Sequence, residues 1–343
     1  DAISLASNLT ATGPDGLTTL HLKHLGPRGI SFLTKLFTLS LKSANLPTIW
    51  KAAHIIPIPK PGKPLGVSTS YRPISLLSPV VKILERLLLP FINPPSLPLS
   101  SSQHGFRPFR STTSCLFPLV NAAVNGFNER KPPTRTAVVA LDISKAFDSV
   151  DHTLLLKQLS DSAINSNVVR WLAAYLRGRT ASCLYQSCKS PSRIIHSGVP
   201  QGSVLSPSLF NFFCSDFPLK AQLTSSFADD FYVGESSHDL SILTSNLQED
   251  LRQIEVWADS KRLVIAPEKS SITLFSPDPH QANHHPQVFY KGAVIPLNKT
   301  PKYLGLICDG KINFSHHASD LKSRLSRRHQ ILKALSGTSF GQS

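Results

Sequence analysis

Apolar and polar positions along the first part of the chain predict short helices and one strand. Apolar residues recur at helical spacing over residues 17–25 and 30–44, which predicts two helices. A mainly apolar run over residues 76–91 predicts a buried helix. Residues 52–59 predict a strand that enters a loop rich in Lys, Pro and Gly.

The middle of the chain predicts a buried strand and a hairpin. The β-branched and apolar run TAVVAL, residues 136–141, predicts a strand that ends at Asp142. Residues 225–233 predict two strands that meet in a tight turn at Ala228, Asp229 and Asp230. Helices are predicted at 144–150, 153–159, 168–176, 203–213, 240–263 and 316–335, and short strands near 271–275, 288–290 and 303–307. Because strands and helices are mixed without regular βαβ alternation, the sequence predicts the α+β class.

Composition and charge narrow the range of partners. The 343 residues are 41% hydrophobic, which suffices for one large domain or a few subdomains with their own cores. Lys and Arg number 36 against 21 Asp and Glu, a net charge of +15. Such a surface attracts polyanions, of which nucleic acid is the commonest. A charge that serves only solubility stays the alternative.

Several classes of protein are disfavoured. The five cysteines lack the close spacing of a zinc site and fit a reduced, intracellular compartment. The most apolar stretch, residues 80–92, contains Lys82, Glu85 and Arg86 and is too short to span a bilayer, so no membrane partner is expected. The chain contains no methionine and begins at Asp1, which predicts an internal fragment of a longer protein.

The candidate catalytic groups are Asp142 at the strand end and Asp229 and Asp230 at the hairpin tip. Gathering three carboxylates is costly unless cations neutralise them, and carboxylates suit Mg²⁺. Two ions about 3.5–4 Å apart would serve in-line phosphoryl displacement. An Asp-Asp pair also favours a turn for conformational reasons alone, and the pattern leaves that explanation open. Asp148 and Asp151 are expected to be solvated residues at helix starts.

Several segments, in a fixed order, resemble one enzyme family. VVALDISKAFDSVDH (138–152), SGVPQGSVLSPSLFN (197–211) and FADD (227–230) resemble motifs A, B and C of LINE-type, non-LTR retrotransposon reverse transcriptases. PEKS around Lys269 and YLGL (303–306) resemble motifs D and E, while IPK (58–60), YRPISL (71–76) and QHGFRPFRST (103–112) resemble the fingers motifs. FADD has Phe where the family more often has Tyr. The jockey-like branch is the most similar in wording.

The resemblance implies a right-hand polymerase fold. Residues 1–29 would extend the fingers, 30–135 would form the fingers, 136–310 the palm with a fingers insertion near 155–195, and 311–343 the start of a thumb. It also implies RNA-directed DNA polymerase activity, with an RNA template, a DNA primer and dNTPs as partners. Two Mg²⁺ ions, or Mn²⁺, would serve the nucleotidyl transfer. The implied location is intracellular, in the nucleus and in cytoplasmic ribonucleoprotein.

The resemblance also assigns catalytic roles to single residues. Asp142, Asp229 and Asp230 would be catalytic metal ligands, with the backbone carbonyl of Ile143 as a further ligand. Lys269 would donate a proton to the leaving pyrophosphate. A surface lysine in a turn would explain the same position.

Five residues would bind the incoming nucleotide: Lys60, Arg72, Phe147, Gln201 and Gly202. Lys60 and Arg72 would contact the triphosphate, and Gly202 would let the backbone approach the nucleotide. Phe147 would exclude ribonucleotides by a clash with the 2′-hydroxyl. The structural alternatives are a solvated loop lysine for Lys60, an ordinary turn for Gln201 and Gly202, and a core ring for Phe147.

Two other functions stay open. A catalytically inactive retroelement remnant would still bind RNA, although the three carboxylates and the Pro-Gln-Gly turn are intact. A group II intron-type maturase would combine polymerisation with help in RNA folding, but YRPISLLS and QHGFR resemble the LINE-type wording more closely. The template, the insertion target, the host and the oligomeric state are left open by the sequence.

Overall fold

The computed structural model describes residues 2–8, 11–93, 99–129, 132–278 and 284–336. The chain forms two compact units that alternate along the sequence. The first unit comprises Asp1–Phe106, Ile143–Phe217 and Ala258–Val264, and the second comprises Arg107–Asp142, Pro218–Trp257 and Ile265–Ser343. No helix among the described residues is both long and apolar enough to cross a membrane.

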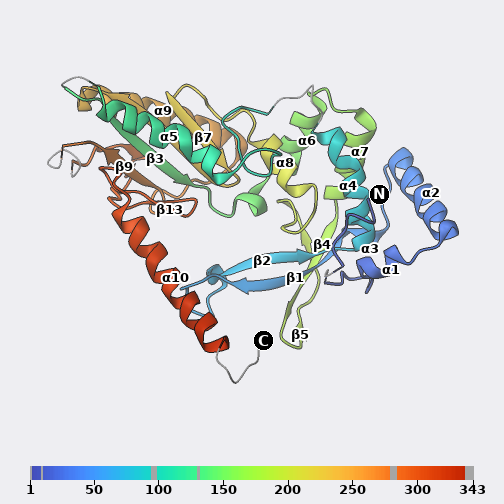
Figure 1. The fold of residues 1–343 in the computed structure, drawn as a ribbon. Helices are drawn as coiled ribbons and strands as arrows, with labels where there is room; N and C mark the ends of the chain where they lie inside the picture. Colours follow the sequence, from blue (N-terminus) through green and yellow to red (C-terminus); the bar gives the residue numbers. More distant parts are fainter. Residues whose placement is uncertain (1, 9–10, 94–98, 130–131, 279–283, 337–343) are drawn as a thin grey trace. The chain divides into compact units, whose positions relative to one another are not determined.

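The first unit combines helices with a mixed sheet (Figure 1). Its helices are α1 (Thr19–Lys23), α2 (Pro27–Ser43), α3 (Thr48–Lys51), α4 (Pro79–Ile92), α6 (His152–Ser160), α7 (Ser166–Leu176) and α8 (Ser206–Phe213), with short 3-10 helices at Ser68–Ser70 and Ala146–Ser149. Its strands are β1 (Ala52–Pro59), β2 (Tyr71–Leu76), β4 (Arg179–Tyr185), β5 (Cys188–Lys189) and β6 (Arg193–Ile195). β1 pairs antiparallel with β2 and parallel with β4.

Helix α4 confirms the buried helix predicted over residues 76–91. It begins where the Ser78 hydroxyl accepts a hydrogen bond from the Val80 amide at 3.2 Å, and Pro79 occupies the first turn, where a missing N–H costs nothing. Val81 and Leu84 on this helix are fully buried. α4 contacts α1 and α8, so it forms the centre of the helical part of the first unit.

The second unit contains the antiparallel sheet β7-β8-β3-β9. The strands of the unit are β3 (Arg135–Asp142), β7 (Leu223–Phe227), β8 (Asp230–Ser237), β9 (Ser271–Phe275), β10 (Phe289–Tyr290), β11 (Ala293–Val294), β12 (Lys302–Tyr303) and β13 (Leu306–Ile307). Its helices are α5 (Thr112–Phe127), α9 (Leu240–Lys261) and α10 (Ser315–Leu335). The last turn of α9 belongs to the first unit. β3 lies between β8 and β9, which confirms the buried strand predicted from the TAVVAL run.

Helix α5 packs against β3, β7 and β8 of this sheet (Figure 1). Cys115 and Leu119 of α5 join Val138, Tyr232 and Phe275 of the sheet in one buried cluster. The apolar pattern did not predict α5, and its sequence contains Pro118, a residue that weakens a helix interior. Packing on the sheet offsets that cost, so the helix depends on tertiary contacts.

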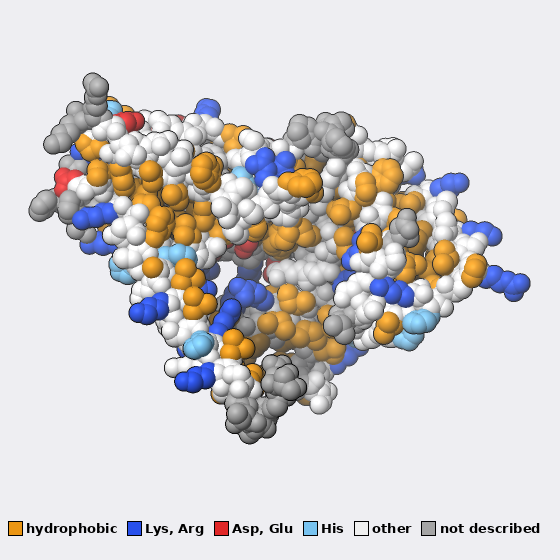
Figure 2. All heavy atoms as spheres, in the orientation of Figure 1, with side chains coloured by type: hydrophobic (Ala, Val, Ile, Leu, Met, Phe, Trp, Pro, Cys, Tyr) orange, Lys and Arg blue, Asp and Glu red, His pale blue; other side chains and the backbone are white. Residues whose placement is uncertain are grey.

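Two predicted elements differ in the structure. The single strand expected near residues 303–307 is a hairpin, β12 paired with β13, because Leu304 and Gly305 both adopt positive φ angles and turn the chain. The predicted basic helix near the carboxyl end is present as α10, but none of its residues is buried. Figure 2 shows Lys and Arg side chains over α10.

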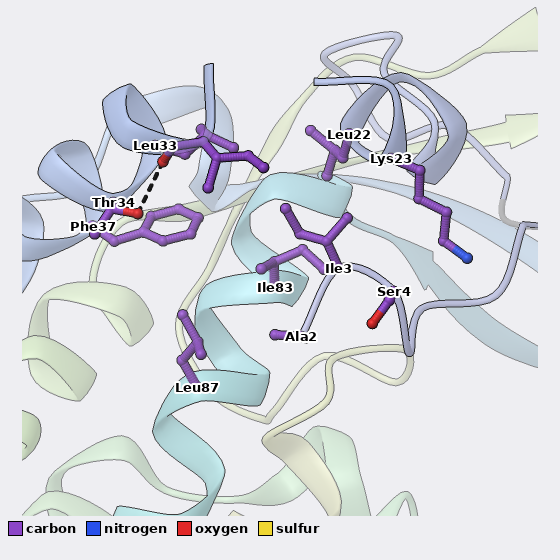
Figure 3. Close-up of a pocket in the computed structure, with 11 residues that line it drawn as sticks. Ala2, Ile3, Ser4, Leu22, Lys23, Leu33, Thr34, Phe37, Ile83 and Leu87 are labelled. Carbon is purple, nitrogen blue, oxygen red and sulfur yellow. Dashed lines mark hydrogen bonds between the residues drawn. The ribbon is translucent and has the colours of Figure 1, made fainter. Parts of the chain in front are cut away.

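The first unit also contains an apolar pocket of about 560 Å³ (Figure 3). Ile3, Leu22 of α1, Phe37 of α2, and Ile83 and Leu87 of α4 are among its lining residues. None of the predicted site residues lines this pocket.

Candidate active site

The predicted catalytic aspartates lie at one end of the second unit's sheet. Asp142 is the last residue of β3, and Asp230 is the first residue of β8. The two residues are direct partners in the antiparallel register. Asp229 precedes Asp230 in the turn between β7 and β8. The structure therefore brings Asp142 and the two hairpin aspartates to the same end of the sheet.

The hairpin turn has a simple local cause. Phe227 and Asp230 are paired, so only Ala228 and Asp229 lie between the strands. Ala228 adopts the left-handed conformation, with φ 57°, which two-residue turns between twisted strands require. The predicted hairpin with its tip at Ala228 and Asp229 is confirmed.

The three carboxylates repel one another. Partial desolvation, and then the negative charges of Asp229 and Asp142, raise the pKa of Asp230 to about 6. The Asp230 side chain is nevertheless exposed at the surface. An exposed carboxylate keeps much of its hydration, so the charges of Asp229 and Asp142 are an important cause of this increase in pKa. The negative charges of Asp229 and Asp142 disfavour ionisation of Asp230. A bound cation would favour it.

A short loop after α9 surrounds the end of β3. The Asp142 amide donates to the Ser270 hydroxyl at 3.2 Å, and the Asp142 carbonyl accepts from the Ala266 amide at 2.9 Å. The Ser270 hydroxyl in turn donates to the Ala266 carbonyl at 2.8 Å. Ser270 is buried and fixes the strand end, a role for which the sequence carries no separate signal.

Lys269 lies next to the carboxylates. Its ammonium group is 3.7 Å from an Asp142 carboxylate oxygen, and both side chains are substantially exposed. An exposed ion pair of this length contributes little to stability. The pair nevertheless places an ammonium group beside Asp142.

The donor set suits a hard divalent cation, since carboxylate oxygens are the ligands that Mg²⁺ prefers. Among the described residues, however, no three His, Cys, Asp or Glu side chains are already arranged as a metal-binding cluster. Asp142 pairs with Lys269 instead. Ile143, whose carbonyl is a predicted ligand, follows Asp142 and is buried.

The predicted nucleotide-binding residues all belong to the first unit. Arg72 on β2 pairs with Ile58 on β1 and is exposed. Lys60 follows β1, and its ammonium group donates to the Thr69 carbonyl at 2.9 Å. Lys60 and Arg72 therefore both lie near one end of the β1–β2 ladder. Their contact with a triphosphate stays a prediction.

The turn that contains Gln201 and Gly202 is attached to β2. The Ser75 amide donates to the Gln201 carbonyl at 2.7 Å. Gly202 has a φ of 138°, and a Cβ atom there would lie 2.3 Å from the Ser75 carbonyl oxygen. Only glycine fits this contact, because a Cβ atom would overlap the β2 backbone. The approach of Gly202 to a nucleotide stays a prediction.

Asp148 has a different role from the one expected. The Gln201 side-chain amide donates to its carboxylate at 3.1 Å. Burial raises the Asp148 pKa, while this hydrogen bond and Lys145 oppose the increase. Asp148 does lie in the first turn of the 3-10 helix Ala146–Ser149, as predicted, but its carboxylate is half-buried and hydrogen-bonded rather than solvated. For Asp151 the helix-start prediction is confirmed, since its carboxylate accepts the Leu154 amide at 3.0 Å at the beginning of α6.

Phe147 is half-buried between two other rings. Its ring stacks on Phe210 with centroids 4.7 Å apart and meets Phe106 edge-on at 6.2 Å. These contacts hold the ring rigidly, which both a core residue and a steric gate would require. The gate therefore stays a prediction.

Two neighbouring strands of the antiparallel sheet bring carboxylates to the same end of the sheet. This arrangement suits phosphoryl-transfer chemistry on metal ions. Comparison with known proteins identifies the family of phosphoryl-transfer proteins to which the chain belongs. Residues 58–308 match the family described as "Reverse transcriptase (RNA-dependent DNA polymerase)". The chain belongs to this family, and the resemblance to LINE-type reverse transcriptases is confirmed.

Individual relatives come from mobile elements of insects. The chain is 32% identical to "RNA-directed DNA polymerase from mobile element jockey" of Drosophila melanogaster, over 91% of this chain and 35% of the relative. It is 30% identical to "Probable RNA-directed DNA polymerase from transposon BS" of the same fly, over 94% of this chain and 36% of the relative. A type-1 retrotransposable element R2 polyprotein of Popillia japonica is 30% identical over 59% of this chain and 27% of the relative. The chain thus spans about a third of the length of the first two relatives.

Proposed function

We propose that this chain is the polymerase core of a non-LTR retrotransposon reverse transcriptase. It would transfer nucleotides from dNTPs to the 3′-hydroxyl of a DNA primer on an RNA template. The observation that carries the proposal is the register pair of Asp142 with Asp230, with Asp229 beside it, in a member of the reverse transcriptase family. The intact carboxylates do not favour the inactive remnant.

In this proposal Asp142, Asp229 and Asp230 hold the divalent ions, Mg²⁺ or Mn²⁺, with help from the Ile143 carbonyl. Ions at this edge would neutralise charge on the transferring phosphoryl group and orient the primer hydroxyl. The carboxylates would act in their ionised form, which the crowding at Asp230 opposes when no cation is bound. Lys269, beside Asp142, would supply a proton toward the leaving pyrophosphate.

The first unit would bind the nucleotide. Lys60 and Arg72 would hold the triphosphate, because guanidinium and ammonium groups donate charge-assisted hydrogen bonds to phosphate. Phe147, together with the turn at Gln201 and Gly202, would bind the sugar and base. The same proposal includes the right-hand arrangement, with fingers at 30–135, palm at 136–310 and the start of a thumb at 311–343. It also includes a location with the element's RNA in the nucleus and the cytoplasm.

Primer extension tests the proposal directly. The full chain is incubated with a poly(rA)/oligo(dT) duplex, dTTP and Mg²⁺, and the extended primer is measured. Asp142→Asn removes one charge from the site with little change in volume. We expect at least about a thousandfold loss of extension, on the order of 4 kcal/mol in the barrier, with duplex binding retained.

Asp161→Asn is the matched control. Asp161 is an exposed aspartate at the end of α6, so the variant changes the net charge equally outside the site. It should extend primers as the unchanged chain does. Extension by Asp142→Asn at the control's rate would exclude the carboxylate mechanism, and a wild-type chain that binds the duplex without extending it would support the inactive remnant.

A further inference from the structure

Helix α4 carries a carboxylate that the proposed reaction does not use. Glu85 is fully buried among apolar neighbours such as Leu84 and Leu88. A buried carboxylate is unfavourable unless hydrogen-bond donors or cations compensate it. Its partners therefore indicate what the residue is for.

The two carboxylate oxygens of Glu85 face different parts of the first unit. Oε1 accepts a hydrogen bond from the Tyr175 hydroxyl of α7 at 2.7 Å. Oε2 accepts from the Ser203 hydroxyl at 2.9 Å and from the Val204 amide at 2.6 Å. One oxygen thus contacts the helical scaffold, and the other contacts the segment that follows Gln201 and Gly202.

A cation lies on the scaffold side. The Arg179 guanidinium is 4.6 Å from the centroid of the Tyr175 ring, and Arg179 is itself buried. A guanidinium over an aromatic ring is attracted to its face. The Tyr175 ring thus lies between this cation and the hydroxyl that binds Oε1. Oε2 remains available to hold the turn.

The turn has its second attachment on β2. The Ser75 amide binds the Gln201 carbonyl, and Gly202 packs without a Cβ against the Ser75 carbonyl. Ser203 also stabilises the start of α8, because its hydroxyl accepts the amides of Leu205 and Ser206. Residues 200–204 are therefore held from β2 on one side and from α4 on the other.

From this geometry we infer that Glu85 is a positioning residue for nucleotide binding. It acts through Ser203 and Val204 to fix the turn of Gln201 and Gly202 against β2, the strand that also carries Arg72. The inference rests on the proposed function, since it assigns the turn to the dNTP. Without the anchor, the turn would sample other conformations, and nucleotide binding would bear the entropic cost of ordering it.

Two measurements on the full chain test the anchor. Glu85→Met replaces the carboxylate with an apolar side chain of similar length and removes both contacts to the turn. Steady-state extension on poly(rA)/oligo(dT) gives KM for dTTP and kcat separately. Amide hydrogen exchange of residues 200–206 reports the order of the turn without any need for activity.

We expect Glu85→Met to raise the KM for dTTP about tenfold or more, with kcat changing less, because two hydrogen bonds to a charged group are lost. Exchange of residues 200–206 should accelerate by about the same factor. Glu85→Gln should restore both values to near wild type, since its amide oxygen can accept from Ser203 and Val204 while its NH₂ group faces the Tyr175 oxygen.

Ser40→Ala is the matched control, because it removes a buried hydroxyl of α2 that accepts a hydrogen bond from the Trp171 indole N–H at 3.1 Å, a contact that involves neither Glu85 nor the turn. It should lower the melting temperature without changing the KM for dTTP. If Glu85→Met does not fold, Ser203→Ala removes the contact from the side of the turn, and it should raise KM in the same direction. Because the Ser203 hydroxyl also accepts the Leu205 and Ser206 amides, only the exchange of residues 201–203 is compared for this variant.

The outcomes separate the two proposals. Unchanged exchange of residues 200–206 in the folded Glu85→Met variant, or of residues 201–203 in the folded Ser203→Ala variant, overturns the inference. Equal increases in KM for Ser40→Ala and Glu85→Met would also overturn it, because the effect would then be general destabilisation. A wild-type chain without extension refutes the proposed function and the assignment to dTTP, whereas the exchange data alone decide whether Glu85 anchors the turn.

Discussion

The contact between Gly202 and Ser75 gives the sharpest quantitative prediction. In Gly202→Ala, the new Cβ atom would lie 2.3 Å from the Ser75 carbonyl oxygen, closer than real Cβ atoms approach. The residue also has a φ of 138°, which L side chains rarely adopt. The variant must therefore move the turn away from β2 or change its backbone conformation.

Both routes cost free energy of unfolding. Moving the turn breaks the hydrogen bond from the Ser75 amide to the Gln201 carbonyl, and a buried N–H left without a partner costs about 1–3 kcal/mol. The positive φ adds about 1–2 kcal/mol for a residue with a Cβ. We expect Gly202→Ala to lower the free energy of unfolding by about 2–5 kcal/mol, the sum of these terms.

Gly178→Ala measures the cost of the positive φ without the clash against β2. Gly178 also belongs to the first unit and has a φ of 66°, but a Cβ there would have no atom within 4 Å. It should therefore show only the conformational cost of about 1–2 kcal/mol. Urea unfolding of both variants gives the difference. Equal losses for the two variants would show that the turn is not tightly packed on β2, and the reasoning about Gly202 would be refuted.

Three further predictions concern selectivity, pH and binding. Phe147→Val should raise ribonucleotide use relative to deoxynucleotide use about tenfold or more, or ~1.4 kcal/mol in relative barrier; an unchanged ratio in the folded variant would leave the ring only its packing role against Phe210. Burial and then the negative charge of Glu235 raise the pKa of Asp250 to about 7 in the folded chain. Protonation of Asp250 therefore stabilises the fold. This stabilisation is complete below the pKa of the unfolded chain, near 3.8, and is lost as the pH rises through 7. Melting temperatures between pH 5 and pH 8 should therefore fall more in the wild type than in Asp250→Asn, and parallel curves would contradict the shift. Deleting the chain from Ser315 onward removes a helix without buried residues, so the melting temperature should stay constant while duplex binding weakens and becomes less dependent on salt; unchanged affinity would assign α10 to another partner.

The sequence by itself determined the elements that local patterns control. The TAVVAL run predicts a strand because a continuous β-branched, apolar segment is stable only inside a sheet. The hairpin at Ala228 and Asp229 follows from two short apolar runs separated by turn residues. The acidic residues at the ends of these elements, and the motifs in their order, sufficed to predict the family and the candidate carboxylates.

The tertiary structure decided which residues meet. The hydrophobic pattern restricts which face of a strand is buried, but it does not say which strands far apart in sequence become neighbours. The pairing of Asp142 with Asp230 is therefore visible only in the folded sheet. Helix α5 was missed because its stability comes from contacts with that sheet rather than from local propensity. In the sequence, Glu85 is only one of three charged residues in a mainly apolar stretch. Its burial depends on Tyr175, Ser203 and Val204, which lie far away in the chain and become its donors only when α4, α7 and the turn after Gly202 pack together.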